Sequence, residues 1–475
     1  MPTTLAPDPH LEDSRTTRAG WWRELRAIAA LGGPVALVQV GMMLMGTVDT
    51  MMLGRVSKEA LAAGALGHTV SFAIFGPVMG LFFAIEALVT QAVGAGDRPR
   101  VARHFARMVV LALYLSVPVV GLLLWVGPRL GGLRQSAELV PLADGYLRGV
   151  APGVAGFFLF LVLRLVLQAE GLVRPALVAV VGSNLVNVAA NYGLVFGGFG
   201  LPALGVYGSG LATSIARWSL CLILLLAGWG GLRRMFRGEL RPAQFVAALR
   251  PREHAATFRL GLPIALHNAA EFWVFSAVGL MMGSLGALQF AAHQIALNLA
   301  ALTFMVPLGI ASAAATRVGN AVGRLDAPGV RRAARVSLIV GAGVMSVSAL
   351  VFALAPRLLS RAYTPDPEVV ALAALLLPIA AVFQVADGFQ VVAAGVLRGA
   401  ADTTWPAAIA LIGFWVVGLP LGALFAYRWA LGPLGLWWGL TAGLAATAVA
   451  LGLRVRARLA HPVQNLQAER DLVAG

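Results

Sequence analysis

LGGPVALVQVGMMLMGTVDTMMLG, residues 31–54, is an apolar run that holds a single ionisable side chain, Asp49. The run is longer than the roughly 20 residues that a helix needs to cross the hydrocarbon core of a bilayer. It does not alternate between apolar and polar residues, as a strand of a membrane barrel would. The stretch therefore predicts a membrane-spanning α-helix that carries a carboxyl group inside the membrane.

The remainder of the chain has the same apolar character. Of its 475 residues, 59% are hydrophobic and 12% are charged, whereas about a quarter of the residues in a soluble domain are charged. Apolar stretches of spanning length recur from one end of the sequence to the other. We therefore expect an all-α integral membrane protein with twelve transmembrane helices, at about 27–53, 60–92, 102–127, 143–166, 174–197, 203–228, 258–284, 289–321, 332–356, 367–395, 405–428 and 433–455.

The arginines predict how these helices are oriented. An excess of arginine in short loops marks the cytoplasmic side of a membrane protein. Both termini are thus expected to be cytoplasmic, as a segment at 1–26 and a tail at 457–475, in a protein of the plasma (inner) membrane. The arginine-rich segments that the twelve spans place on this one side are 15–26, 97–107, 232–254, 323–335 and 454–461.

The net charge of +15 agrees with this orientation, because basic loops contact anionic lipid headgroups. Membrane lipid is therefore an expected partner. Nucleic acid is not an expected partner, since the arginines are scattered among loops. Cys221 is the only cysteine, which excludes an intrachain disulfide and a cysteine-based metal site.

The two halves of the chain repeat each other. LGGPVAL (31–37) reappears as LGLPIAL (260–266), and AVGAGD (92–97) reappears as AVGRLD (321–326), both at an offset of 229 residues. A constant offset that preserves glycine, proline and aspartate indicates an internal duplication. Because six spans is an even number, both halves insert in the same direction. We expect two pseudo-symmetric six-helix lobes, an N-lobe at 27–228 and a C-lobe at 258–456, joined by a cytoplasmic linker at 229–257, with cargo bound between them.

Three carboxylates lie well inside predicted spans: Asp49, Glu271 and Asp387. An acidic residue at a helix centre costs about 2.5–3.5 kcal/mol on insertion scales, and such residues usually face a cavity or a partner. Glu86, nearer the cytoplasmic end of its span, is a fourth candidate. Helix packing is the alternative role for any one of them, but three on separate helices favour a functional site.

Polar side chains share helix faces with these carboxylates. His267 and Asn268 precede Glu271 by four and three residues, so all three project from one face. His267 is expected to be a hydrogen-bonded wall residue rather than a metal ligand, because no second histidine or cysteine lies at ligand spacing. Further amides flank Asp387 or follow one face of the fifth span, namely Gln384, Gln390, Asn184, Asn187 and Asn191.

Among these amides, Asn184 is expected to join helices, whereas Asn187 and Asn191 are expected to hydrogen-bond Asp49 inside the N-lobe. Arg164 and Arg398 lie near cytoplasmic helix ends, where they are expected to extend toward water. A set of methionines and aromatic residues is expected to supply adaptable apolar walls, and about half of it to face lipid or other helices. This set comprises Met42, Met43, Met45, Met51, Met52, Met281, Met282, Met305, Phe72, Phe75, Phe272 and Trp273.

Four stretches resemble the multidrug and toxic compound extrusion family, in its NorM-like branch. They are GTVDTMMLGRVSKEALAAGALG (46–67), QAVGAGD (91–97), AAHQIALN (291–298) and QVADGFQVVAAGVLRG (384–399). The resemblance covers residues 25–455 and implies twelve helices in two lobes, an outward-opening central cavity, and export of amphipathic organic cations driven by entry of Na⁺ or H⁺. It also implies coupling roles for Asp49, Asn187 and Asn191 in the N-lobe.

In the C-lobe the resemblance implies that Glu271 and Asp387 form the site for the coupling cation or proton. Some relatives carry a tyrosine four residues before this aspartate, where the present chain has Phe383. The missing hydroxyl argues against Na⁺ coordination, and His267 beside Glu271 argues for a proton. Both coupling ions stay open.

The sequence narrows the class of function. The only lysine, Lys58, is followed by Glu59, so the chain lacks the Lys-Ser/Thr pair of an ATP-binding P-loop. No HExxH or GxSxG motif occurs, so an enzyme is not expected, and no cofactor is expected either. We predict a monomeric secondary exporter of drugs, with a flippase for lipid-linked precursors as the alternative and a membrane enzyme of unrecognised type ranked last.

Overall fold

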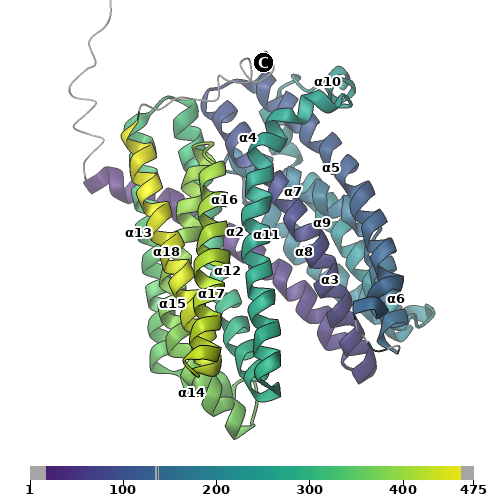
Figure 1. Cartoon of the computed structure of the whole chain (residues 1–475). Helices are drawn as coiled ribbons and strands as arrows, with labels where there is room; N and C mark the ends of the chain where they lie inside the picture. Colours follow the sequence, from purple (N-terminus) through teal and green to yellow (C-terminus); the bar gives the residue numbers. More distant parts are fainter. Residues whose placement is uncertain (1–17, 134–135, 137, 462–475) are drawn as a thin grey trace, which may run out of the picture.

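The computed structural model describes residues 18–133, 136 and 138–461, and every regular element within them is helical (Figure 1). The first half of the chain contains two short 3₁₀ turns, Gly127–Leu133 and Gly198–Gly200. Its α-helices are α2 (Arg18–Leu53), α3 (Lys58–Phe82), α4 (Ile85–Gly94), α5 (Arg98–Val126), α6 (Leu139–Val150), α7 (Gly153–Ala169), α8 (Arg174–Phe196) and α9 (Gly205–Phe236).

The linker holds α10 (Pro242–Ala248) and a 3₁₀ turn at Pro251–His254. The second half contains α11 (Ala255–Leu285), α12 (Ala287–Gly323), α13 (Ala327–Leu354), α14 (Pro356–Arg361), α15 (Pro367–Gly399), α16 (Thr404–Leu411), α17 (Leu419–Ala423) and α18 (Gly432–Ala460). Among the described residues, eleven helices are long and apolar enough to span a membrane, and a bent pair makes up to twelve. The chain is therefore an all-α, multi-pass membrane protein, as the sequence predicts.

Three predicted spans are not straight helices. The fourth consists of α6 and α7, which meet at a 47° bend at Ala151 and Pro152, because proline cannot continue the backbone hydrogen-bond ladder. The second is interrupted at Phe83 and Ala84, between α3 and α4. The eleventh contains two π-helical stretches, Ile412–Gly418 and Leu424–Arg428, separated by α17.

Two helices extend furthest beyond the predicted boundaries. Helix α2 begins at Arg18 rather than near residue 27, and one reason is that Glu24 is buried and ion-paired with Arg317 at 2.8 Å. Helix α9 continues to Phe236 and carries Arg233 and Arg234 in its last turn, where cations stabilise the helix end. Residues 1–17 and 462–475, predicted to be cytoplasmic, lie outside the described residues.

Helix α2 crosses from one lobe to the other (Figure 1). Near its start, Ile28 is fully buried in a cluster with C-lobe residues such as Val318 and Val392. Near its end, Leu53 is buried in the N-lobe core. Helix α11 makes the equivalent crossing, since its first half packs against α3. Each lobe thus contributes its first helix to the boundary between the lobes.

The duplication is visible at this boundary as two matched close approaches. A Cβ atom added at Gly80 would lie 2.6 Å from the backbone nitrogen of Ala265, and one added at Gly309 would lie 2.7 Å from that of Ala36. Gly309 and Ala265 stand 229 residues after Gly80 and Ala36. Only glycine permits such contacts, because real Cβ atoms do not approach backbone this closely.

A second matched pair lies at the ends of α4 and α12. A Cβ at Gly94 would lie 2.9 Å from the Cα atom of Asn320, and one at Gly323 would lie 2.9 Å from the carbonyl carbon of Gln91. Residues 320 and 323 are again 229 positions after 91 and 94. We call the side of the molecule on which α4, α12 and the linker helix α10 end the linker face; it is at the top of Figure 1.

Candidate functional site

The Asp49 carboxylate is buried on α2, with 4% of the residue exposed, and accepts hydrogen bonds from two other helices. The side-chain amides of Asn187 and Asn191, on α8, donate to its Oδ1 at 3.0 and 2.7 Å. The Thr213 hydroxyl, on α9, donates to its Oδ2 at 2.6 Å. Both carboxylate oxygens are therefore occupied, and the three donors fix the side chain in one orientation.

The asparagines are where the sequence places them, because positions 187 and 191 share one face of α8. Thr213 is the member of the group that sequence reasoning missed. It lies one turn after Ser209, whose backbone oxygen is 3.1 Å from its hydroxyl oxygen and is the alternative acceptor. A threonine in an apolar span carries no signal of its own, since such hydroxyls commonly bond the preceding turn. Asn184, in contrast, donates to the backbone oxygen of Gly41 and joins α8 to α2.

In the C-lobe, Gln390 bridges the two predicted carboxylates. Its side-chain nitrogen lies 3.4 Å from Oε1 of Glu271, on α11, and 3.4 Å from Oδ1 of Asp387, one turn away on α15. Nε2 of His267 lies 3.9 Å from Oε2 of Glu271, and its other ring nitrogen lies 3.1 Å from the backbone oxygen of Pro406. The structure therefore brings the two acids, Gln390 and His267 into one group, in which Glu271 is half-buried and the other three are buried.

Two residues expected beside these acids, Gln384 and Asn268, form no hydrogen bond with them within the described residues. The side-chain oxygen of Gln384 accepts hydrogen bonds from Thr303 at 2.9 Å and Ser348 at 2.7 Å, which joins α15 to α12 and α13. Asn268 is only half-buried, and no hydrogen bond ties it to Glu271 or Asp387 in the described structure. Phe383, in place of a hydroxyl-bearing residue, packs edge-on against Phe275 and Trp437 with ring centroids 5.9 and 5.8 Å apart.

Glu86 takes part in a different group, at the boundary between the lobes. Its carboxylate is 2% exposed and lies 3.0 Å from Nε of Arg398, on α15 of the other lobe. The Ser312 hydroxyl, on α12, also donates to it. Gln168 donates to Ser312 and Thr316, and so ties α7 to the same helix. These groups form a polar contact between the lobes.

Two side-chain amides complete this contact nearer the linker face. Gln91 donates to the backbone oxygen of Gly399 at 3.0 Å, and Asn320 donates to that of Ala169 at 3.1 Å. Gly399 and Ala169 are the last residues of α15 and α7. Each lobe therefore caps the end of one helix of the other lobe, and the two amides are equivalent under the repeat.

The surroundings of the buried arginines differ from what the sequence predicts. Arg398 and Arg164 do not extend toward water: they are 8% and 4% exposed, and Arg164 lies 3.4 Å from Gln39. The predicted outward extension is wrong because Arg398 finds a buried counter-charge in Glu86. Arg217, in the middle of α9, was not singled out at all, although it is also 8% exposed. Its guanidinium lies over the rings of Phe75 and Phe157, at 4.9 and 5.2 Å.

No group of three or more histidine, cysteine, aspartate or glutamate side chains at metal-binding distance occurs among the described residues. The pair Glu271 and Asp387 with the Gln390 amide offers oxygen donors and shareable protons. Such donors suit a hard monovalent cation or a proton rather than a transition metal. The predicted methionine walls are mixed, because Met45 and Met282 are buried in the lobe cores whereas Met51 is exposed.

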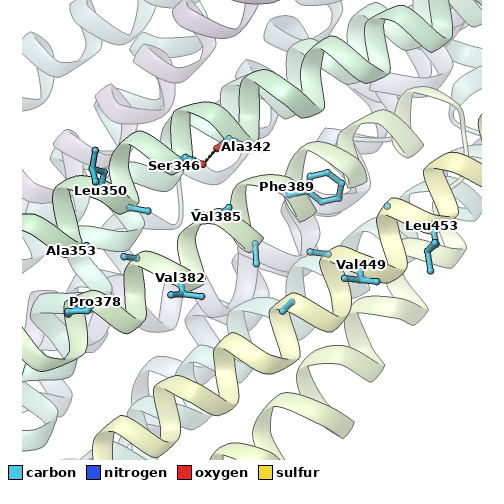
Figure 2. A pocket seen from close by; sticks show the side chains of 16 residues that line it. Ala342, Ser346, Leu350, Ala353, Pro378, Val382, Val385, Phe389, Val449 and Leu453 are labelled. Atoms are coloured by element: carbon cyan, nitrogen blue, oxygen red, sulfur yellow. Dashed lines mark hydrogen bonds between the residues drawn. The ribbon is translucent and has the colours of Figure 1, made fainter.

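A groove of about 940 Å³ lies on the outer side of the C-lobe, between α13, α15 and α18 (Figure 2). Its lining is almost entirely apolar, and Leu350, Val382 and Val449 are more than half exposed there. None of the candidate carboxylates contributes to it. Since this outer face meets the hydrocarbon of the bilayer, the groove is not part of the candidate site.

The chain matches the MatE family model twice, over residues 34–193 and 263–424. The two matched segments correspond to the two lobes. "Probable multidrug resistance protein NorM" of Burkholderia pseudomallei is 40% identical over 454 residues, covering 90% of this chain and 94% of that protein. "Multidrug resistance protein PmpM" of Pseudomonas aeruginosa is 36% identical over 442 residues, covering 91% of each.

Solved structures share the fold. The crystal structure of the eukaryotic MATE transporter AtDTX14 superposes with a TM-score of 0.83 at 23% identity, covering 96% of this chain and 98% of that one. The Vibrio cholerae MATE transporter VcmN in its bent form superposes with a TM-score of 0.81 at 18% identity, covering 93% and 98%. At these identities the similarity establishes the arrangement of the helices.

Proposed function

This chain belongs to the MatE family, and on that premise we propose that it is a secondary multidrug exporter that moves amphipathic organic cations across the plasma membrane in exchange for Na⁺ or H⁺. The curated relatives named above are multidrug resistance proteins that align with nearly the whole chain. The chain contributes both lobes itself, so a monomer suffices for this role.

The observation that carries the proposal is a buried acid group in each lobe. Asp49 is held by three donors in the N-lobe, and Glu271 and Asp387 are bridged by Gln390 in the C-lobe. Ionisable residues inside a membrane are costly and typically mark ion or substrate pathways. Two acids that share an amide can hold one cation, or one proton between them, and release it when their surroundings change.

The two groups have different expected roles. Glu271 and Asp387 would bind the coupling ion, and His267 would hold Glu271 in place through its own contact with Pro406. Asp49 would exchange its bonds to Asn187 and Asn191 for the cargo or the ion during the cycle. Repeat-based transporters typically move by rocking one half against the other around a central site.

We further propose that the present arrangement faces outward. The cross-lobe hydrogen bonds of Gln91, Gln168 and Asn320 and the Glu86–Arg398 ion pair all belong to the half of the molecule nearer the linker face. The excess of arginine in the loops at that face supports a cytoplasmic position for it and for both termini. Contacts that close the cytoplasmic side would leave the binding site accessible from outside.

The alternative, a flippase for lipid-linked precursors, has one observation in its favour: the buried guanidinium of Arg217 is a cation inside a lobe. A phosphate-bearing cargo would need a cationic site, whereas three acidic residues dominate the interior here. The exporter is therefore the better-supported function.

The test is transport of a fluorescent organic cation into everted membrane vesicles, with Na⁺ and pH gradients imposed separately. We expect accumulation that depends on one of the two gradients and is lost in Glu271→Gln and Asp387→Asn. Accumulation that persists without either gradient, or its absence under both, would contradict the proposal. Transport of a lipid-linked pyrophosphate in place of the cation would favour the flippase.

A further inference from the structure

Arg217 is a buried cation that the coupling scheme does not use. It lies twelve residues into α9, far from either end of the helix, and is 8% exposed. Its Nη1 atom is buried and has no hydrogen-bond partner among the residues that the structure describes. A guanidinium withdrawn from water is costly unless an anion compensates its charge. The aromatic faces of Phe75 and Phe157 supply only part of that compensation.

The charged group near Arg217 is already engaged by other donors. Asp49 lies close enough for the two charges to interact, but both of its oxygens are held by Asn187, Asn191 and Thr213. No direct ion pair joins Asp49 to Arg217 within the described residues. When Asp49 takes up a proton, or when a bound cation balances its charge, Arg217 is left as an uncompensated positive charge.

An aromatic path connects Arg217 to the boundary between the lobes. Phe72 and Phe272 make a ring contact across the lobes at 5.2 Å, and Phe72 contacts Phe75 at 5.7 Å. Phe75 in turn lies against the guanidinium. Only two rings therefore separate Arg217 from the other lobe, and both belong to side chains that can reorient when the lobes part.

The two lobes consequently differ in the charged groups that they hold in their interiors. The C-lobe group contains two acids, and the arginine whose charge reaches Glu271, Arg398, is itself paired with Glu86. The N-lobe group contains one acid and a guanidinium that forms no ion pair within the described residues. A molecule with a cation at one end and an anion at the other would meet its complement in each lobe.

We propose that Arg217 is an anion-binding subsite of the N-lobe, which receives the carboxylate of a zwitterionic amphipathic cargo while the cationic end faces the acids of the C-lobe. This inference rests on the proposed exporter function and specifies its cargo class. The guanidinium matches a planar carboxylate through paired hydrogen bonds, which a lysine cannot reproduce. Phe75 and Phe157 would hold the aromatic part of the cargo next to that carboxylate.

The test uses two dyes that differ only at the group in question. Rhodamine 123 is a methyl ester, and rhodamine 110 carries a free carboxylate in its place. Both are offered to everted vesicles that contain the wild-type protein, Arg217→Gln, Arg217→Lys or the control Arg148→Gln. Arg148 is a suitable control because its ion pair with Asp144, at 2.8 Å, leaves its side chain 58% exposed.

We expect the wild-type protein to transport both dyes, and Arg217→Gln to lose at least about tenfold in rhodamine 110 transport while rhodamine 123 changes by less than about twofold. Arg217→Lys should keep part of the rhodamine 110 transport, and Arg148→Gln should resemble the wild type. Equal loss of both dyes, or no loss in Arg217→Gln, would overturn the subsite.

Two outcomes separate this inference from the proposed function. Transport of rhodamine 123 but not rhodamine 110 by the wild type would overturn the subsite and leave the exporter intact. Transport of neither dye would contradict the exporter, and binding to the purified protein, measured by fluorescence polarisation, would then decide the subsite. The same binding measurement on the wild-type protein keeps the subsite testable if Arg217→Gln does not fold. Binding of rhodamine 110 to the wild type that is more than about tenfold weaker than binding of rhodamine 123 would overturn the subsite.

Discussion

The carboxylate of Glu86 and the guanidinium of Arg398 lie 3.0 Å apart across the boundary between the two lobes. Both side chains are more than nine-tenths buried, and the Ser312 hydroxyl also donates to the Glu86 carboxylate. Because the pair joins helices of different lobes, it has to break if the lobes separate on the linker face. The energy of this ion pair therefore contributes both to folding and to the equilibrium between the conformation with the lobes closed on the linker face and the one with the lobes parted there.

We expect Glu86→Gln and Arg398→Gln each to lower the free energy of unfolding by about 3–5 kcal/mol, because each leaves an unpaired charge in the interior. The double variant should lose less than the sum of the two single losses. Denaturation of the purified protein in detergent gives these values. Arg148→Gln, at an exposed pair, should change the free energy by at most about 1 kcal/mol. Strictly additive losses would show that the pair does not interact.

The matched glycines give a second prediction. Gly80→Ala and Gly309→Ala should each cost about 1–3 kcal/mol by overpacking, since the new methyl group meets the backbone of the facing helix at 2.6 and 2.7 Å. The lobes should then be unable to close fully on the linker face. A cysteine placed at the buried Thr316, in a Cys221→Ser background, should become more reactive toward a maleimide.

Gly121→Ala is the control for this experiment, because a Cβ there meets nothing within 4 Å. Equivalence under the repeat predicts that Gly80→Ala and Gly309→Ala raise the labelling to a similar extent. An effect of only one of the two would show that the lobes do not share the contact equally.

The sequence predicts helices, their approximate ends and the duplication, because apolar length and a constant offset are local properties of the chain. It also predicts that Asn187 and Asn191 share a face. It cannot choose between Gln384 and Gln390, which stand three residues before and after Asp387 and flank its face of the same helix. Only the packing of α15 decides that Gln390 turns toward Glu271 and Gln384 toward Ser348.

Contacts between residues of different lobes cannot be predicted from the sequence either, because only the packing of the helices brings the two residues together. Glu86 and Arg398 are separated by more than three hundred residues, and neither periodicity nor spacing relates them. The bend between α6 and α7 has a local cause, Pro152, but whether a proline bends or ends a helix depends on its neighbours. Arg217 has a local signal, an arginine within an apolar span, which indicates a functional side chain.

Asp49→Asn provides the third prediction. Asparagine keeps the shape of the side chain, its oxygen can still accept from Asn187 and Asn191, and its amide can donate to Thr213. The variant should therefore insert and fold as the wild type does. Because it cannot gain or lose a proton, it should export at least about tenfold more slowly if Asp49 exchanges one.

The measurement is cation transport in vesicles, normalised to the amount of folded protein. Thr213→Ser keeps the hydroxyl that donates to Asp49 and serves as the control, whereas Thr213→Val removes it. Transport by Asp49→Asn at the wild-type rate under every gradient would reduce Asp49 to a packing residue.

The last prediction compares two fully buried glutamines on α15, Gln390 and Gln384. Methionine has nearly the same size as glutamine but donates no hydrogen bond. Gln390→Met removes the amide that bridges Glu271 and Asp387, so we expect the concentration of coupling ion for half-maximal transport to shift by about tenfold. Gln384→Met instead removes the oxygen that accepts from Ser348 and Thr303 and joins α15 to α13 and α12, which should lower the free energy of unfolding by about 1–3 kcal/mol and leave the ion dependence unchanged. Ion titrations of transport give the half-maximal ion concentration of each variant, and unfolding curves give its free energy of unfolding. A shift in ion dependence with Gln384→Met but not with Gln390→Met would place the coupling site beside Gln384 and contradict the bridged pair.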